Sequence, residues 1–82
     1  MSSSASGIYR RLRTLVADTL GVEESDVVPE ASFEDDLNVD HQELVDLMVA
    51  IEEEFGVKID DSEMANLSTV GDAVEFLEDQ LA

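Results

Sequence analysis

The stretch DLNVDHQELVDLMVAIEEEF, residues 36–55, determines how this 82-residue chain folds. Its apolar residues recur at spacings of three and four, the pattern of a helix that buries one stripe. Asp40 precedes that stripe and Glu43 follows three residues later, which predicts a helix start closed by a capping box. Gly56 then predicts the end of the helix. The buried stripe is expected to consist of Leu44, Leu47, Met48, Ile51 and Phe55.

Two more long helices are expected, one on each side of this one in the sequence. The same spacing predicts a first helix over residues 8–20, which Gly21 ends. The last helix is expected to begin near Thr69, whose hydroxyl can cap it, with Asp72 three residues later. The apolar stripes are Ile8, Leu12, Leu15, Val16 and Leu20 in the first helix, and Val70, Ala73, Val74, Leu77 and Leu81 in the last.

The connections between these helices differ in length. Residues 22–39 show no helical period, and so long a connection in a small domain is usually functional or packed by its own side chains. We expect Phe33 and Leu37 to hold it against the core. A short helical element is expected over residues 62–66, capped by Asp61. The sequence therefore predicts an all-α domain of three long helices and one short helix.

Length and composition favour a single domain, over residues 8–82, after a flexible tail over residues 1–7. The chain has no cysteine, which excludes disulfides and thiolate metal sites. It also has no apolar run near the roughly 18 residues of a membrane span, so no membrane insertion is expected. Residues 1–17 are rich in serine and arginine, as in a targeting peptide, but the first helix needs them. We therefore expect a cytoplasmic location.

The charge of the chain is strongly negative. A formal net charge of −17 arises from 21 acidic and 4 basic residues. Such a surface repels nucleic acid, whose binding depends on basic residues, and favours proteins with basic patches. It also disfavours self-association, so a monomer is expected. The alternative that the acidity only keeps a small domain soluble stays open.

Residues 36–42, DLNVDHQ, resemble the attachment region of acyl carrier proteins, which reads DLGxDSL. The resemblance runs without a gap over residues 33–77 and implies an acyl-carrier-protein-like four-helix bundle with a long loop between helices 1 and 2. The chain departs from the family at three places: His41 stands at the serine position, Gln42 at the leucine position and Asn38 at the glycine position. The positions that match are Phe33, Asp36, Leu37, Asp40, Glu52, Glu53, Glu54, Phe55, Gly56, Ile59, Thr69, Val70, Asp72, Ala73 and Val74.

The resemblance also implies a cofactor position. In the family the serine carries 4'-phosphopantetheine, an arm that holds acyl groups as thioesters, and a helix start favours its phosphodiester. An imidazole nitrogen that attacks phosphorus gives a labile phosphoramidate, and the ring does not suit a transferase site shaped around a hydroxyl. We therefore expect no cofactor on this chain, with His41 only marking the attachment position.

Catalysis and metal binding are not expected. Asp40 can orient the His41 ring, but the chain has no cysteine, no second histidine and no serine at a recognisable triad spacing. The acidic runs 34–36 and 60–61 lack the ligand spacing and the glycine of an EF-hand. Only weak, nonspecific cation binding is expected there.

The resemblance further implies that the predicted helix after Asp40 is the recognition element. Family members present acids there to basic patches of synthases, transferases and other enzymes of fatty acid, lipid or polyketide biosynthesis. An ordinary solvated helix face is the alternative. The partner-binding positions implied are Asp40, Gln42, Glu43, Val45, Asp46, Met48, Glu52, Glu53 and Ile59.

Two other functions stay open. The first alternative is an ordinary acyl carrier protein whose serine was mutated to histidine. The second is an acidic mimic of nucleic acid that binds basic proteins in place of nucleic acid. His41 itself is a loss, an engineered replacement or a new functional group, and the accompanying changes at Gln42 and Asn38 favour natural divergence. Captured partners separate these functions, because the first predicts enzymes of the carrier pathway and the second predicts nucleic-acid-binding proteins.

Overall fold

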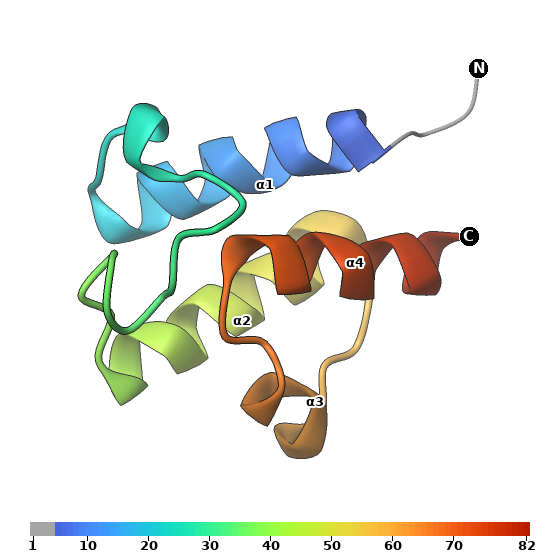
Figure 1. Ribbon diagram of the computed structural model, residues 1–82. Coiled ribbons are helices and arrows are strands. Elements are labelled where there is room, and N and C mark those ends of the chain that lie inside the picture. The colour runs from blue at the N-terminus through green and yellow to red at the C-terminus, as the bar shows by residue number, and fades with distance from the viewer. Residues whose placement is uncertain (1–4) are drawn as a thin grey trace.

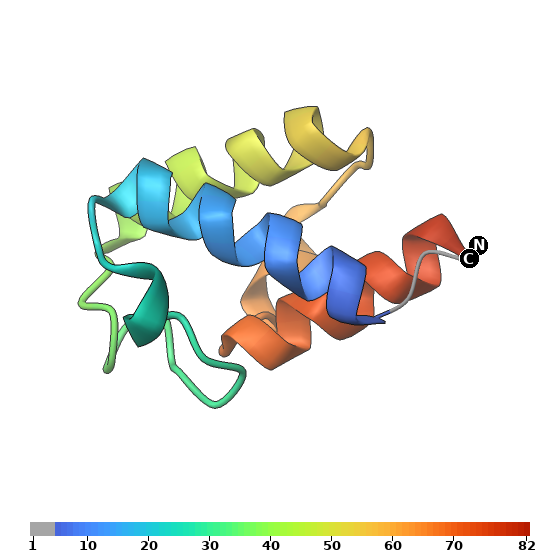
Figure 2. The same ribbon diagram turned by 90° about the horizontal axis from the view of Figure 1, so that it is seen from above.

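The computed structural model describes residues 5–82, and this part of the chain is all-α, as predicted. Figures 1 and 2 show α1 lying along both α2 and α4, with α3 on the side of these two helices that faces away from α1. A short 3₁₀ turn, η1, follows α1. The elements are α1 (Ala5–Leu20), η1 (Glu24–Asp26), α2 (His41–Phe55), α3 (Asp61–Ala65) and α4 (Val70–Leu81).

The core is an apolar cluster to which all three long helices and the loop before α2 contribute. Each long helix buries one stripe because its apolar residues recur at helical spacing. The predicted stripes are confirmed at most positions, although Leu15, Leu20 and Leu44 are half-buried and Leu81 is exposed. The fully buried side chains are Leu12, Val16, Val27, Phe33, Leu47, Ile51, Val70 and Leu77.

Two predicted boundaries need correction. Helix α1 begins at Ala5, so residues 5–7 belong to it rather than to a tail, whereas residues 1–4 lie outside the described part. Helix α3 spans Asp61–Ala65 rather than residues 62–66, and its N-cap is Asp60 rather than Asp61. The Asp60 N–H donates to Glu63 Oε1 at 3.1 Å. With two aspartates in sequence, the position of Glu63 three residues after Asp60 decides which of them is the cap.

The long loop is fixed to the start of α4 by backbone hydrogen bonds. The Val70 N–H donates to Ala31 O at 3.0 Å and the Gly71 N–H donates to Pro29 O at 2.9 Å, while the Phe33 N–H donates to Ser68 O at 3.0 Å. Side chains complete this attachment, because Phe33 is 1% exposed and Leu37 is 7% exposed, as predicted. Carbonyl groups of the loop therefore accept hydrogen bonds from N–H groups in the first turn of α4, which have no acceptor within the helix.

Asn38 has a backbone conformation that explains why the related motif carries glycine at this position. Its φ is 58°, in the left-handed region, where a Cβ costs roughly 1–2 kcal/mol and asparagine is the best tolerated residue after glycine. The turn places Val39 in the core and Asp40 at the start of α2. The substitution of glycine by asparagine thus preserves the turn.

This conformation gives a test of the loop geometry. Asn38→Val should lower the free energy of unfolding by about 1–2 kcal/mol, because a β-branched residue resists positive φ. Asn38→Gly should change it by less than about 1 kcal/mol, since glycine adopts this φ freely but also loosens the unfolded chain. Urea unfolding followed by circular dichroism measures both. Equal stabilities of the two variants would contradict the left-handed turn.

Candidate functional site

The start of α2 presents His41 as its first residue, with Asp40 as the N-cap. The predicted capping box is confirmed: the Glu43 N–H donates to Asp40 Oδ1 at 2.8 Å and the Asp40 N–H donates to Glu43 Oε1 at 3.1 Å. Both carboxylates are therefore engaged in fixing the helix start, although they remain exposed. The imidazole of His41 is exposed and lies outside this box.

Within residues 5–82, the first two N–H groups of α2, those of His41 and Gln42, donate to no protein acceptor. This differs from α4, where loop carbonyls occupy the corresponding N–H groups of Val70 and Gly71. Free N–H groups and the positive end of a 15-residue helix favour an anion at this place.

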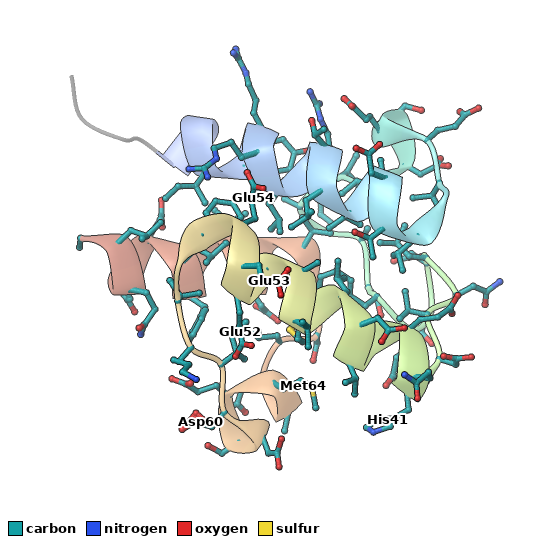
Figure 3. All side chains as sticks on the ribbon, turned by 180° about the vertical axis from the view of Figure 1, so that it is seen from behind. His41, Glu52, Glu53, Glu54, Asp60 and Met64 are labelled. Carbon is teal, nitrogen blue, oxygen red and sulfur yellow. The ribbon has the colours of Figure 1, made fainter. Side chains whose placement is uncertain are left out.

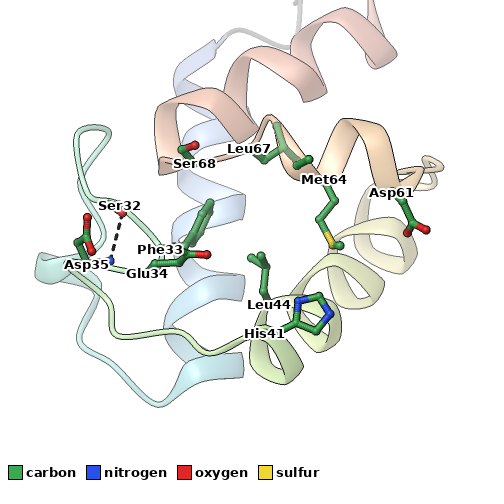
Figure 4. Close-up of a pocket in the computed structure, with 11 residues that line it drawn as sticks. Ser32, Phe33, Glu34, Asp35, His41, Leu44, Asp61, Met64, Leu67 and Ser68 are labelled. Carbon is green, nitrogen blue, oxygen red and sulfur yellow. Dashed lines mark hydrogen bonds between the residues drawn. The ribbon is translucent and has the colours of Figure 1, made fainter.

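A groove of about 520 Å³ lies beside His41, between the loop before α2, the first turns of α2, and α3. Figure 4 shows the His41 ring at its edge, near Leu44, with Met64 facing them from α3. Phe33 and Leu67 also line the groove, from the loop and from the segment after α3, although they are only 1% and 7% exposed. Acidic side chains, Glu34, Asp35 and Asp61, stand around it.

The outer face of α2 carries four exposed side chains at helical spacing: Gln42, Asp46, Val49 and Glu53. Residues at i, i+4, i+7 and i+11 lie along one face of a helix. The Gln42 Nε2 donates to Asp46 Oδ1 at 3.2 Å, which orders the first turns of this face. Val49 is 46% exposed, so an apolar group stands between carboxylates. We call these four residues the α2 face.

Met48 is a partner contact that the resemblance implies, whereas the helical period places it in the buried stripe. Its side chain is only 4% exposed and packs in the core beside Leu47 and Ile51. Val49, one residue later and therefore about 100° around the helix, takes the outward place instead. The signal was present in the sequence, because Met48 also belongs to the predicted buried stripe. The other two apolar predictions, Val45 and Ile59, are half-buried.

The glutamates at the end of α2 do not lie together. Glu52 is half-buried, and its Oε2 accepts the Ile59 N–H at 2.7 Å. Glu54 pairs with Arg11, whose Nη2 lies 3.3 Å from Glu54 Oε2 and donates to Glu54 O at 3.1 Å. Glu53 is exposed and has no polar partner within the described chain. Figure 3 shows the three side chains leaving α2 in different directions.

The described residues, 5–82, contain no group of three or more histidine, cysteine, aspartate or glutamate side chains placed to hold a metal ion. None of the helices in this part of the chain is long and apolar enough to cross a bilayer.

Comparison with known families defines the class of this protein. Residues 10–77 match the family model described as a phosphopantetheine attachment site. The matched range runs from α1 through most of α4 and includes the start of α2. The match thus places the chain in the phosphopantetheine attachment site family.

Relatives identify the family within that class. The chain is 43% identical over 79 residues to an acyl carrier protein of Thermotoga maritima, covering 96% of this chain and 98% of the relative. It is 47% identical over 77 residues to acyl carrier proteins of Thermosynechococcus vestitus and Acidothermus cellulolyticus, covering 94% of this chain and 95% and 92% of those proteins. The chain belongs to the acyl carrier protein family, whose members are carriers rather than enzymes.

Proposed function

We propose that this chain acts by binding: it docks enzymes of acyl-chain metabolism through the α2 face and carries no 4'-phosphopantetheine on His41. The observation that carries the proposal is the combination of an intact helix start and an exposed α2 face with a side chain that is unsuited to the arm. The capping box, the free N–H groups and the groove are what we would expect around an attachment site. The nucleophile itself is replaced by His41, and residues 38 and 42 also depart from the family motif.

The chemistry of His41 supports the loss of attachment. A serine hydroxyl that attacks the pyrophosphate of coenzyme A loses its proton, breaks the bridging P–O bond, releases adenosine 3',5'-bisphosphate and leaves a stable phosphodiester on the serine. An imidazole nitrogen in the same place forms a phosphoramidate, which water cleaves. The ring also carries its nitrogens farther from the backbone than a serine carries its oxygen, so the geometry of a transferase is not met. His41 also lacks a cysteine or second histidine to act with it in catalysis.

The charge of the chain supports basic partners. With a formal net charge of −17, the protein attracts basic patches from a distance and repels other copies of itself, which favours a monomer. The α2 face adds local specificity, because Val49 offers apolar contact between Asp46 and Glu53. Enzymes of fatty acid, lipid or polyketide biosynthesis with a basic rim and an apolar centre fit this arrangement.

One alternative has a specific observation in its favour. An ordinary acyl carrier protein whose serine was changed to histidine would keep the helix start, the left-handed turn at Asn38 and high identity to acyl carrier proteins, and the chain has all of these. The two proposals agree on docking. They differ on whether histidine is the natural residue at position 41. The sequence of the gene in its source organism answers this question.

Docking is tested with a broad-specificity phosphopantetheinyl transferase and no coenzyme A, so that only binding is measured. Asp46→Lys should raise the Kd for the unmodified chain about tenfold, because it places a like charge against the basic patch. Asp79→Lys, which changes the net charge equally on the exposed end of α4, should raise it less than about threefold. Isothermal titration at low and high salt measures both. Equal effects of the two variants would indicate nonspecific attraction and overturn the proposal.

A further inference from the structure

We infer that the three consecutive glutamates of α2 have separate tasks: Glu52 positions the turn before α3, and Glu54 joins α2 to α1 through Arg11. Glu53, which alone of the three has no polar partner among residues 5–82, is the carboxylate that a basic partner contacts. This inference rests on the proposed docking function for the role of Glu53. The tasks of Glu52 and Glu54 follow from contacts inside the protein. The sequence-based expectation that Glu52 and Glu53 act alike is therefore revised.

Helix geometry separates the three side chains. Successive residues of an α-helix are rotated by about 100°, so three in a row spread over about 200°. They cannot share a face. Figure 3 shows this spread: Glu54 extends toward α1, Glu53 projects from the outer side of α2, and Glu52 lies on the side of the segment that leads to α3.

Glu52 holds the segment between α2 and α3. Its Oε2 accepts the Ile59 N–H at 2.7 Å across seven residues, a short hydrogen bond to a charged acceptor. Ile59 packs against the core, and the next residue, Asp60, is the N-cap of α3. Since α3 supplies Met64 to the groove beside His41, the Glu52 carboxylate also fixes one wall of that groove. Glu52 is thus a positioning residue.

Glu54 is turned toward α1 and is partly neutralised there. Arg11 lies 3.3 Å from the Glu54 carboxylate and also donates to the Glu54 carbonyl. The same guanidinium lies over the Phe55 ring, 4.5 Å from its centroid. An exposed ion pair alone contributes little stability, but the shared contacts with a carbonyl and a ring hold Arg11 at the end of α2. A partner on the α2 face meets neither charge directly.

Glu53 and Glu54 are both exposed, but Glu54 is paired with Arg11, whereas Glu53 has no polar partner among residues 5–82. It is four residues after Val49 and seven after Asp46, on the α2 face. A lysine or arginine of a partner that contacts Val49 therefore meets Glu53 and Asp46 on either side. Asp46 and Glu53, rather than all three glutamates 52–54, are therefore the negative charges that a basic partner contacts on the α2 face.

Amide hydrogen exchange tests the positioning role without any partner. Glu52→Ala should speed exchange of the Ile59 N–H by about tenfold or more, because the donor loses its acceptor. Glu52→Gln, whose amide oxygen still accepts, should restore protection to within about threefold of the original chain. Glu53→Gln should leave the Ile59 N–H unchanged. Unaltered exchange in Glu52→Ala, or no restoration by Glu52→Gln, would overturn the assignment of Glu52.

Binding of the transferase tests the role of Glu53. Glu53→Gln should weaken binding about fivefold at low salt, and the difference should shrink at high salt. Glu52→Gln and Glu54→Gln remove the same charge and should weaken binding less than about twofold. Equal losses in all three variants would overturn the separation of tasks. If the unchanged chain does not bind the transferase at all, both the proposed function and the role of Glu53 are wrong. The hydrogen-exchange experiment still tests the role of Glu52, because it needs no partner.

Discussion

Replacement of His41 by serine is expected to turn the chain into a substrate for 4'-phosphopantetheine attachment. With coenzyme A and a broad-specificity phosphopantetheinyl transferase, the His41→Ser chain should gain the mass of one arm, and the unchanged chain should gain none. Intact-mass spectrometry gives an all-or-none answer, so this is the largest effect we expect on function.

The physical reason lies in what surrounds residue 41. The Asp40 N-cap and the free N–H groups at the start of α2 do not depend on the imidazole, and the groove beside residue 41 keeps its other lining residues, among them Leu44 and Met64. A serine placed there is exposed and stands where a helix end favours the new phosphodiester. The substitution should not disturb the fold, because His41 is exposed and lies outside the capping box.

Two controls make the result decisive. His41→Ala should gain no arm, which shows that the serine hydroxyl is the acceptor. Gln42→Leu with His41 retained should also gain none, which shows that residue 42 alone does not restore attachment. An arm on the unchanged chain would contradict the proposed loss, and an unmodified His41→Ser chain would show that the divergence extends to the surface that the transferase recognises.

The sequence was sufficient for those parts of the fold that depend on local pattern. Asp40 with Glu43 and Thr69 with Asp72 form the predicted capping boxes, and Gly21 and Gly56 end α1 and α2 with positive φ. These features involve residues a few positions apart, so spacing alone reveals them.

The sequence was not sufficient where distant segments meet. Nothing local indicates that Arg11 reaches the end of α2, that the Tyr9 hydroxyl donates to Val27 O at 2.7 Å, or that Glu52 is used by Ile59. Each of these contacts depends on how the helices pack. Met48 shows another limit: the resemblance implies it as a partner contact, while the helical period places it in the buried stripe, where the structure has it.

Truncation of Phe33 is expected to have the largest effect on stability. Phe33→Ala should lower the free energy of unfolding by about 3–5 kcal/mol, because a large and fully buried side chain leaves a cavity. Small domains are stable by only about 5–15 kcal/mol, so the variant should be close to unfolding. Urea titration followed by circular dichroism measures the change.

The loss of stability in Phe33→Ala should exceed the cost of the cavity alone, because the Phe33 side chain also holds the long loop to the start of α4. Val28→Ala is the matched control, since Val28 is in the same loop but 41% exposed, and it should cost less than about 0.5 kcal/mol. The Phe33→Ala chain should also lose protection of the Val70 and Gly71 N–H groups, which donate to the loop. A loss of stability below about 1 kcal/mol, with these amides still protected, would mean that the loop is held by its backbone hydrogen bonds rather than by Phe33.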